Sequence, residues 1–110
     1  MVLRSAVVVL LMGLCASTVA VSQRIGGDVS MDEYLMLLGQ VDPAARDGAE
    51  AFREAFRRNC KREISTLELR RAVAEGDGDP VLMGMMRASH QRDQSELLRL
   101  ASQVRCSTGP

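Results

Sequence analysis

From residue 30 towards the C-terminus, apolar residues recur three or four positions apart, which is the spacing of one face of an α-helix. Two segments show this spacing first. In "MDEYLMLLGQV" the residues on one face are Tyr34, Leu35, Leu38 and Val41. In "AARDGAEAFREAFRR" they are Ala45, Ala49, Phe52 and Phe56. No stretch alternates with a period of two, so the sequence predicts an all-α fold of four to five short helices with almost no sheet.

Local signals predict where these helices begin. Ser30 and Glu33 have the spacing of a capping box, in which each residue's side chain satisfies the other's backbone N–H. Pro43 follows "VD" and suits the first turn of a second helix. Ser65, or the residue after it, can cap a third helix over "LELRRAVA".

The last predicted helix is the longest. It follows "EGDGDP", the clearest break in the chain, and runs from about Pro80 to Arg105. Its apolar positions are interrupted by the polar stretch "SHQRDQSE"; they are Leu82, Met83, Met86, Leu97, Leu100, Ala101 and Val104.

The N-terminus has the three parts of a secretory signal peptide. Arg4 precedes the apolar run "AVVVLLMGLC", and the small residues "ASTVAVS" follow it. We expect residues 1–22 to be removed, with cleavage after Ala20 or after Ser22. The alternative is a retained membrane anchor, although a spanning helix usually needs about 20 apolar residues.

Residues 23–106 then form a single domain with a short C-terminal tail, 107–110. The chain holds 14 basic and 14 acidic residues, and loss of Arg4 leaves 14 − 1 = 13 basic ones. This balance, with no Trp, one Tyr and two Phe, argues against nucleic-acid binding and against membrane binding after cleavage. We expect a secreted protein, extracellular or in a bacterial periplasm.

Two cysteines remain after cleavage. Cys15 leaves with the signal peptide, whereas Cys60 and Cys106 stay in the domain. An even count in an exported chain favours a disulfide, which would stabilise the fold by about 4 kcal/mol in the chain-entropy model. The alternative is two free thiols.

The segment "AFREAFRRNCKREISTLELRRAV" resembles an EF-hand, the helix–loop–helix unit of the calmodulin and troponin C family. The resemblance makes Arg57–Glu68 the twelve-residue loop, with Asn59, Glu63 and Glu68 at its third, seventh and twelfth positions. In that family the twelfth residue supplies a bidentate carboxylate to calcium, and the eighth residue, here Ile64, pairs with a neighbouring loop.

The same register occurs twice more. Residues 22–33 place Gly27 sixth, Val29 eighth and Glu33 twelfth, and a weaker match begins at His90 and places Leu97 eighth. The resemblance therefore implies loop pairing through Val29, Ile64 and Leu97. It implies vestigial calcium-loop positions at Gly27, Glu33, Asn59, Glu63 and Glu68.

The loops depart from the family where calcium would bind. The middle loop has Arg57 and Lys61 where oxygen ligands are needed, and Arg62 in place of the usual glycine. A like charge 4 Å from the ion costs about 4 kcal/mol at an effective dielectric of 20. We therefore expect no calcium at physiological affinity, since Arg57 or Lys61 can neutralise the site from within. The alternative is a generic helical bundle without EF-hand ancestry.

A second chemistry is suggested by Met83, Met86 and His90, which share a helical face and could bind Cu(I). Methionines on a helix are more often core filler or contact surface. His90 is the only histidine, and we expect Cys60 and Cys106 to be bonded to each other, so we expect no enzyme activity.

The sequence thus predicts a secreted, disulfide-bonded helical module that binds an unidentified protein or peptide and needs no cofactor. The expected partner groove is lined by Leu35, Leu38, Met83 and Met86. The alternatives are a weak calcium or Met/His copper binder, and a small helical secreted factor or inhibitor without EF-hand ancestry.

The first testable prediction concerns the exported form. Its intact mass should match a chain beginning at residue 21 or 23, and reduction should add the mass of two hydrogen atoms. Mass spectrometry before and after reduction measures both values. A mass matching the full 110 residues would contradict cleavage, and an unchanged mass on reduction would contradict the disulfide.

Overall fold

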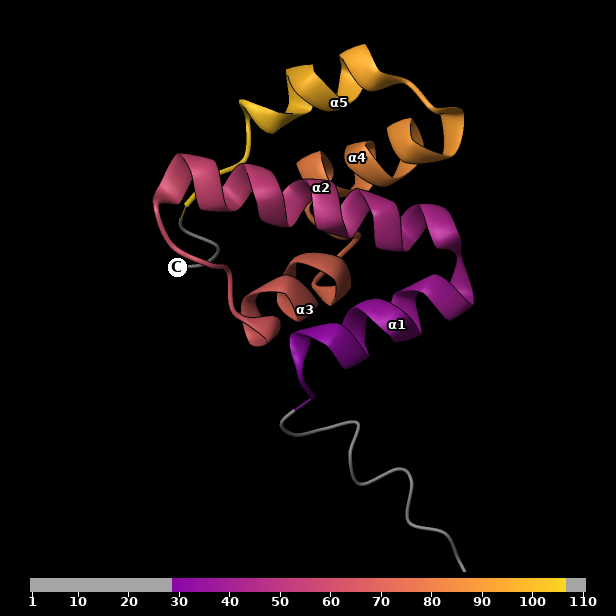
Figure 1. The fold of residues 1–110 in the computed structure, drawn as a ribbon, viewed down its shortest axis with the longest axis vertical. Helices are drawn as coiled ribbons and strands as arrows, with labels where there is room; N and C mark the ends of the chain where they lie inside the picture. The colour runs from indigo at the N-terminus through magenta and orange to yellow at the C-terminus, as the bar shows by residue number, and fades with distance from the viewer. Residues whose placement is uncertain (1–28, 107–110) are drawn as a thin grey trace, which may run out of the picture.

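The computed structural model describes residues 29–106 as five α-helices, and this range contains no strand (Figure 1). The helices are α1 (Met31–Val41), α2 (Pro43–Cys60), α3 (Thr66–Ala74), α4 (Pro80–Gln91) and α5 (Gln94–Ala101). The all-α prediction is confirmed. The predicted signal peptide, the tail 107–110 and the predicted loop position Gly27 lie outside the described residues.

The helix starts follow the local signals in the sequence. Ser30 and Ser65 cap α1 and α3, and each forms a complete capping box with the glutamate three residues later, Glu33 or Glu68. Pro43 opens α2 after Asp42, whose carboxylate accepts the backbone N–H of Ala44 at 2.9 Å. These boundaries are predictable because the interactions that set them span only a few residues.

The prediction of one long helix from Pro80 to Arg105 is wrong. The chain reverses at Arg92, which adopts a left-handed conformation with φ of 56°, and Asp93 then caps α5. A single helix over 80–105 would be about 39 Å long, whereas the 18 residues of α2 span about 27 Å. The reversal folds α5 back along α4, so that Leu100 and Val104 join the core.

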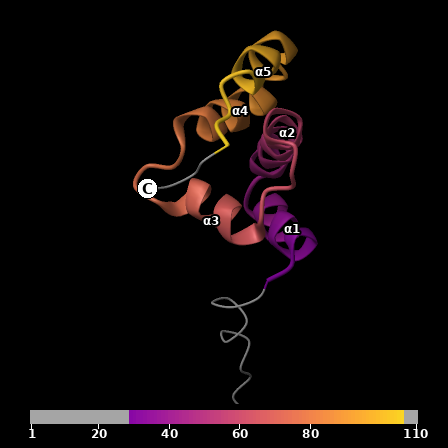
Figure 2. The same cartoon turned by 90° about the vertical axis from the view of Figure 1, so that its left-hand side faces the viewer.

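Helix α2 is the centre of the fold. Figure 2 shows it between α1 on one side and the α4–α5 pair on the other, and it packs against all three. The largest fully buried side chains come from α2, α3 and α4; they are Phe52, Phe56, Leu69, Leu82 and Met85.

Helices α2 and α4 approach each other closely at Gly48. A Cβ atom at this position would lie 2.5 Å from the Cα and 2.6 Å from the backbone N of Met86. Both neighbours are backbone atoms of a helix, so they cannot move aside as a side chain can. The two helices pack at this distance only because residue 48 has no side chain.

We predict that Gly48→Ala lowers the free energy of unfolding by about 2 kcal/mol, because the added methyl group forces α2 and α4 apart. Chemical denaturation followed by circular dichroism measures the change. Gly39→Ala is the matched control: its Cβ would meet only the flexible Arg46 side chain, 3.1 Å away. Alanine there should raise stability by about 0.5–1 kcal/mol through helix propensity. Equal stability of Gly48→Ala and the native protein would contradict the constraint.

Candidate functional site

The predicted calcium loop is a short linker. Its non-helical part is residues 61–65, because residues 57–60 form the last turn of α2 and residues 66–68 the first turn of α3. Residues two apart on a helix point in different directions, so Arg57 and Asn59 do not converge on a common centre. The prediction that residues 57–68 form a twelve-residue EF-hand-like loop is therefore wrong for this segment.

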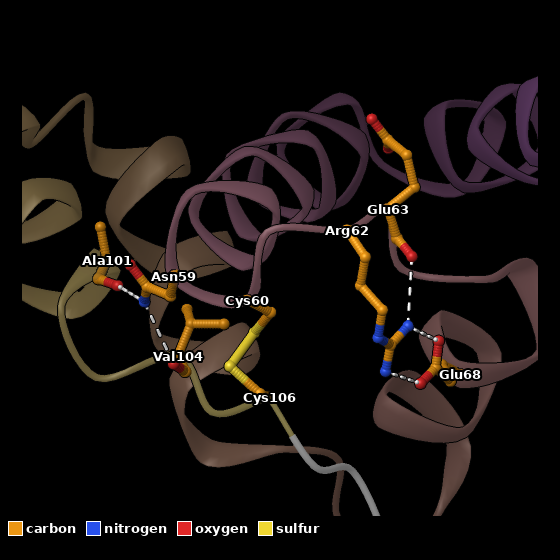
Figure 3. The surroundings of a disulfide bond; sticks show 8 residues. All are labelled: Asn59, Cys60, Arg62, Glu63, Glu68, Ala101, Val104 and Cys106. Atoms are coloured by element: carbon orange, nitrogen blue, oxygen red, sulfur yellow. Dashed lines mark hydrogen bonds and ion pairs between the residues drawn. A yellow bond between two sulfur atoms is a disulfide. The ribbon is translucent and has the colours of Figure 1, made fainter.

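The carboxylate of Glu68 is held inside the linker. It accepts hydrogen bonds from both Nη atoms of Arg62, at 3.0 and 2.8 Å (Figure 3). It also accepts the backbone N–H of Ser65 at 2.8 Å. The Arg62 bonds, followed by the Ser65 backbone bond, lower the pKa of Glu68 to about 2. Glu68, the twelfth position of the predicted loop, thus forms a bidentate ion pair with Arg62 and completes the cap of α3.

Arg62 also connects this pair to the core. Its guanidinium carbon lies 4.8 Å from the centroid of the Phe56 ring, in cation–π contact, and Phe56 is fully buried. Sequence reasoning missed Arg62 as the neutralising cation, because its pairing with Glu68 crosses the linker and follows no helical spacing. The contact joins the end of α2 to the start of α3.

Glu63, the other acidic residue of the linker, also has nearby partners. Glu63 lies 3.6 Å from Arg53 and 4.0 Å from Arg57, and Arg57 also pairs with Glu54 on α2. Lys61 ends α2 in a left-handed conformation with φ of 59° and donates its backbone N–H to Arg57. Arg57 therefore neutralises Glu63, whereas the backbone of Lys61 caps a helix.

Two consecutive residues at the end of α2 hold the C-terminal segment. The Asn59 amide donates to the carbonyl oxygens of Ala101 and Val104, at 3.0 and 3.1 Å. Cys60 and Cys106 form the predicted disulfide, with their Cα atoms 5.3 Å apart (Figure 3). The third loop position thus donates hydrogen bonds to backbone carbonyls at the end of α5 and just beyond it.

The predicted loop pairing is absent from residues 29–106. Val29 and Ile64 precede α1 and α3, but no backbone hydrogen bond of this range joins them, and neither lies in a strand. Ile64 is only 3% exposed and belongs to the core. Leu97 lies inside α5 and His90 in the last turn of α4, so the third predicted loop is wrong: helix occupies most of it.

The predicted partner groove is not open. Leu35 is 4% exposed and lies in the core, while Leu38, Met83 and Met86 are partly buried against the same core. Met86 sits at the helix contact with Gly48, so packing occupies these side chains. The described residues include no cluster of three or more His, Cys, Asp or Glu suited to a metal ion.

Large apolar side chains are exposed elsewhere, and sequence reasoning did not single out these positions as a surface. They are Met36, Leu37 and Val41 on α1, Leu67 on α3 and Leu98 on α5. The signal was present in "YLMLL", since four consecutive apolar residues cannot all lie on one face of a helix. Three of these side chains therefore gather on α1.

Comparisons with protein-family models, with characterised proteins and with solved structures found no match. The EF-hand resemblance therefore remains a prediction. Across residues 29–106, none of the helices combines the length and the apolar character that crossing a bilayer requires.

We predict that Glu68→Gln destabilises the fold at pH 7 by about 1 kcal/mol. The folded-state pKa of about 2 lies below the ordinary value, so this contribution is present above about pH 4.5 and is lost as the pH falls towards 2. The side chain is 22% exposed, and solvent screening keeps the figure modest.

Urea denaturation at pH 7, 4 and 2.5 measures this contribution. The native protein should lose stability relative to Glu68→Gln between pH 4 and 2.5. The control is Glu75→Gln, since Glu75 pairs with Arg71 at 3.9 Å and both are exposed. It should change stability by less than about 0.5 kcal/mol. Equal effects of the two substitutions at pH 7 would contradict a special role for Glu68.

Proposed function

We propose that this chain is an exported helical protein that acts by binding another protein or peptide, and that its EF-hand-like α2–α3 unit is a structural joint. The observation that carries this proposal is the exposed apolar surface of α1: Met36, Leu37 and Val41 are 52%, 45% and 83% exposed. Clustered apolar side chains on the surface of a small domain are typical of contact sites.

The charge pattern of the linker supports a role without calcium. To bind an ion, Glu68 would have to exchange two hydrogen bonds from Arg62 for the cation, and Arg62 would then remain beside it. Asn59 would have to release the two carbonyl oxygens that it holds. Both changes would weaken the joint between α2, α3 and the C-terminal segment.

Export is supported by two independent features. The first is the charged, apolar and small-residue order of residues 1–22. The second is the Cys60–Cys106 disulfide, because such bonds persist mainly in oxidising compartments. The same bond engages both cysteines of the domain, which supports a binding role over thiol catalysis.

We predict that the metal-free exported protein takes up no calcium at micromolar concentration and keeps its helicity. Calorimetric titration with Ca²⁺ and then with Cu(I), each followed by circular dichroism, measures both. Calcium binding accompanied by a change in helicity would contradict the structural role of the linker. Cu(I) binding that is lost in His90→Ala would favour the metal-handling alternative.

Partner binding is tested by photocrosslinking in the producing cells. A photoreactive residue is placed in turn at Met36, Leu67 and Leu98, the exposed apolar positions of three different helices. A covalent adduct of defined mass from at least one position is expected. Absence of an adduct from all three positions would contradict the proposed function.

A further inference from the structure

We propose that the outer face of α1 is a docking surface for a basic amphipathic helix of the partner protein. This inference rests on the proposed function and adds the surface and the chemistry of the partner. The outer face of α1 is defined here by residues 33, 36, 37, 40 and 41, which follow helical spacing along the whole helix.

Helix α1 is apolar on two sides. Its inner side packs on the core through Met31, Tyr34, Leu35 and Leu38. Its outer face carries Met36 and Leu37, with Glu33 and Gln40 between them. Val41, which the sequence pattern placed on one face with Leu35, lies at the edge of this face in the last turn and is 83% exposed. A helix that is apolar on both sides is ordinarily covered on both, and no other part of residues 29–106 covers this one.

The charges around the outer face are mainly acidic. Asp32 and Glu33 lie in the first turn of α1, the last turn has no basic residue, and Asp42 follows directly. The neighbouring cations are Arg46 of α2 and Arg70 of α3. The Arg46 side chain lies against Gly39 and pairs with Glu50 at 3.4 Å, and Arg70 lies near Tyr34, whose pKa is raised by burial and lowered to a smaller extent by the charge of Arg70. We call Asp32, Glu33 and Asp42 the acidic rim of this face. An apolar surface with an acidic rim complements an amphipathic helix whose apolar face is bordered by Lys and Arg.

The same charges disfavour other occupants. Two α1 helices of a dimer would bring acidic ends close together in either orientation: Asp32 against Asp42 when antiparallel, and Asp32 against Asp32 when parallel. An anionic lipid surface would repel the acidic rim.

The test uses the exported protein and a fluorescein-labelled 18-residue peptide of Leu and Lys, with Leu at positions i, i+3, i+4 and i+7. A second peptide replaces every Lys with Glu. Fluorescence anisotropy should show saturable binding of the Lys peptide, weaker at high salt, and none of the Glu peptide. Absence of binding by the Lys peptide, or equal binding of the two peptides, would overturn the proposal.

Paired variants locate the surface. Leu37→Ser with Val41→Ser should weaken binding of the Lys peptide at least tenfold, as loss of central apolar anchors does. Leu98→Ser on α5 is the matched control, since Leu98 is 72% exposed, and it should change the affinity less than twofold. Circular dichroism should show unchanged helicity in both variants. Equal affinities of the two variants would overturn the assignment to α1.

Two further measurements test whether a second copy of the chain or a membrane occupies this face instead. Sedimentation should show a monomer, and vesicles containing phosphatidylserine should not bind. A dimer, or vesicle binding, that is lost in the Leu37→Ser and Val41→Ser protein would overturn the proposal in favour of a second copy or a membrane. Photocrosslinks from Leu67 or Leu98 alone, without peptide binding, would leave the proposed function intact and remove only the α1 surface.

Discussion

The contact between α2 and α4 at Gly48 is the constraint on which the rest of the structure depends. Glycine in a helix interior costs about 0.5–1 kcal/mol relative to alanine, and here the cost is offset by a backbone approach that no other residue permits. Small buried residues, Ala44 and Ala49, flank it on α2, and Phe52 and Phe56 follow one and two turns later. The close approach places α4, and α5 folded upon it, over these two aromatic rings.

The end of α2 is joined to α3 and to the C-terminal segment by side chains and a disulfide. A calcium ion in an EF-hand loop orders two helices through shared oxygen ligands. Here Arg62 forms an ion pair with Glu68 and contacts the face of the Phe56 ring. Asn59 donates to the carbonyl oxygens of Ala101 and Val104, and Cys60 forms a disulfide with Cys106. In the structure the linker is ordered by the chain's own charges and by a disulfide.

Helix α1 differs from the other helices because its apolar residues exceed what the core can cover. The domain is small, and α2 offers one face to α1 and another to α4. Once Leu35 and Leu38 pack inward, helical geometry directs Met36, Leu37 and Val41 outward. The fold leaves this surface uncovered, and the acidic residues beside it are the reason we propose a basic partner.

The sequence by itself determined the features that depend on near neighbours. Both capping boxes, the start of α2 at Pro43, the all-α class and the pairing of the two domain cysteines follow from short-range spacing or from counting. Only the tertiary structure decided the reversal at Arg92, the partner of Glu68, the burial of Leu35 and the exposure of Leu37. These features depend on which helices meet and at what distance. The helical period shows which residues share a face of a helix, but it does not show what covers that face.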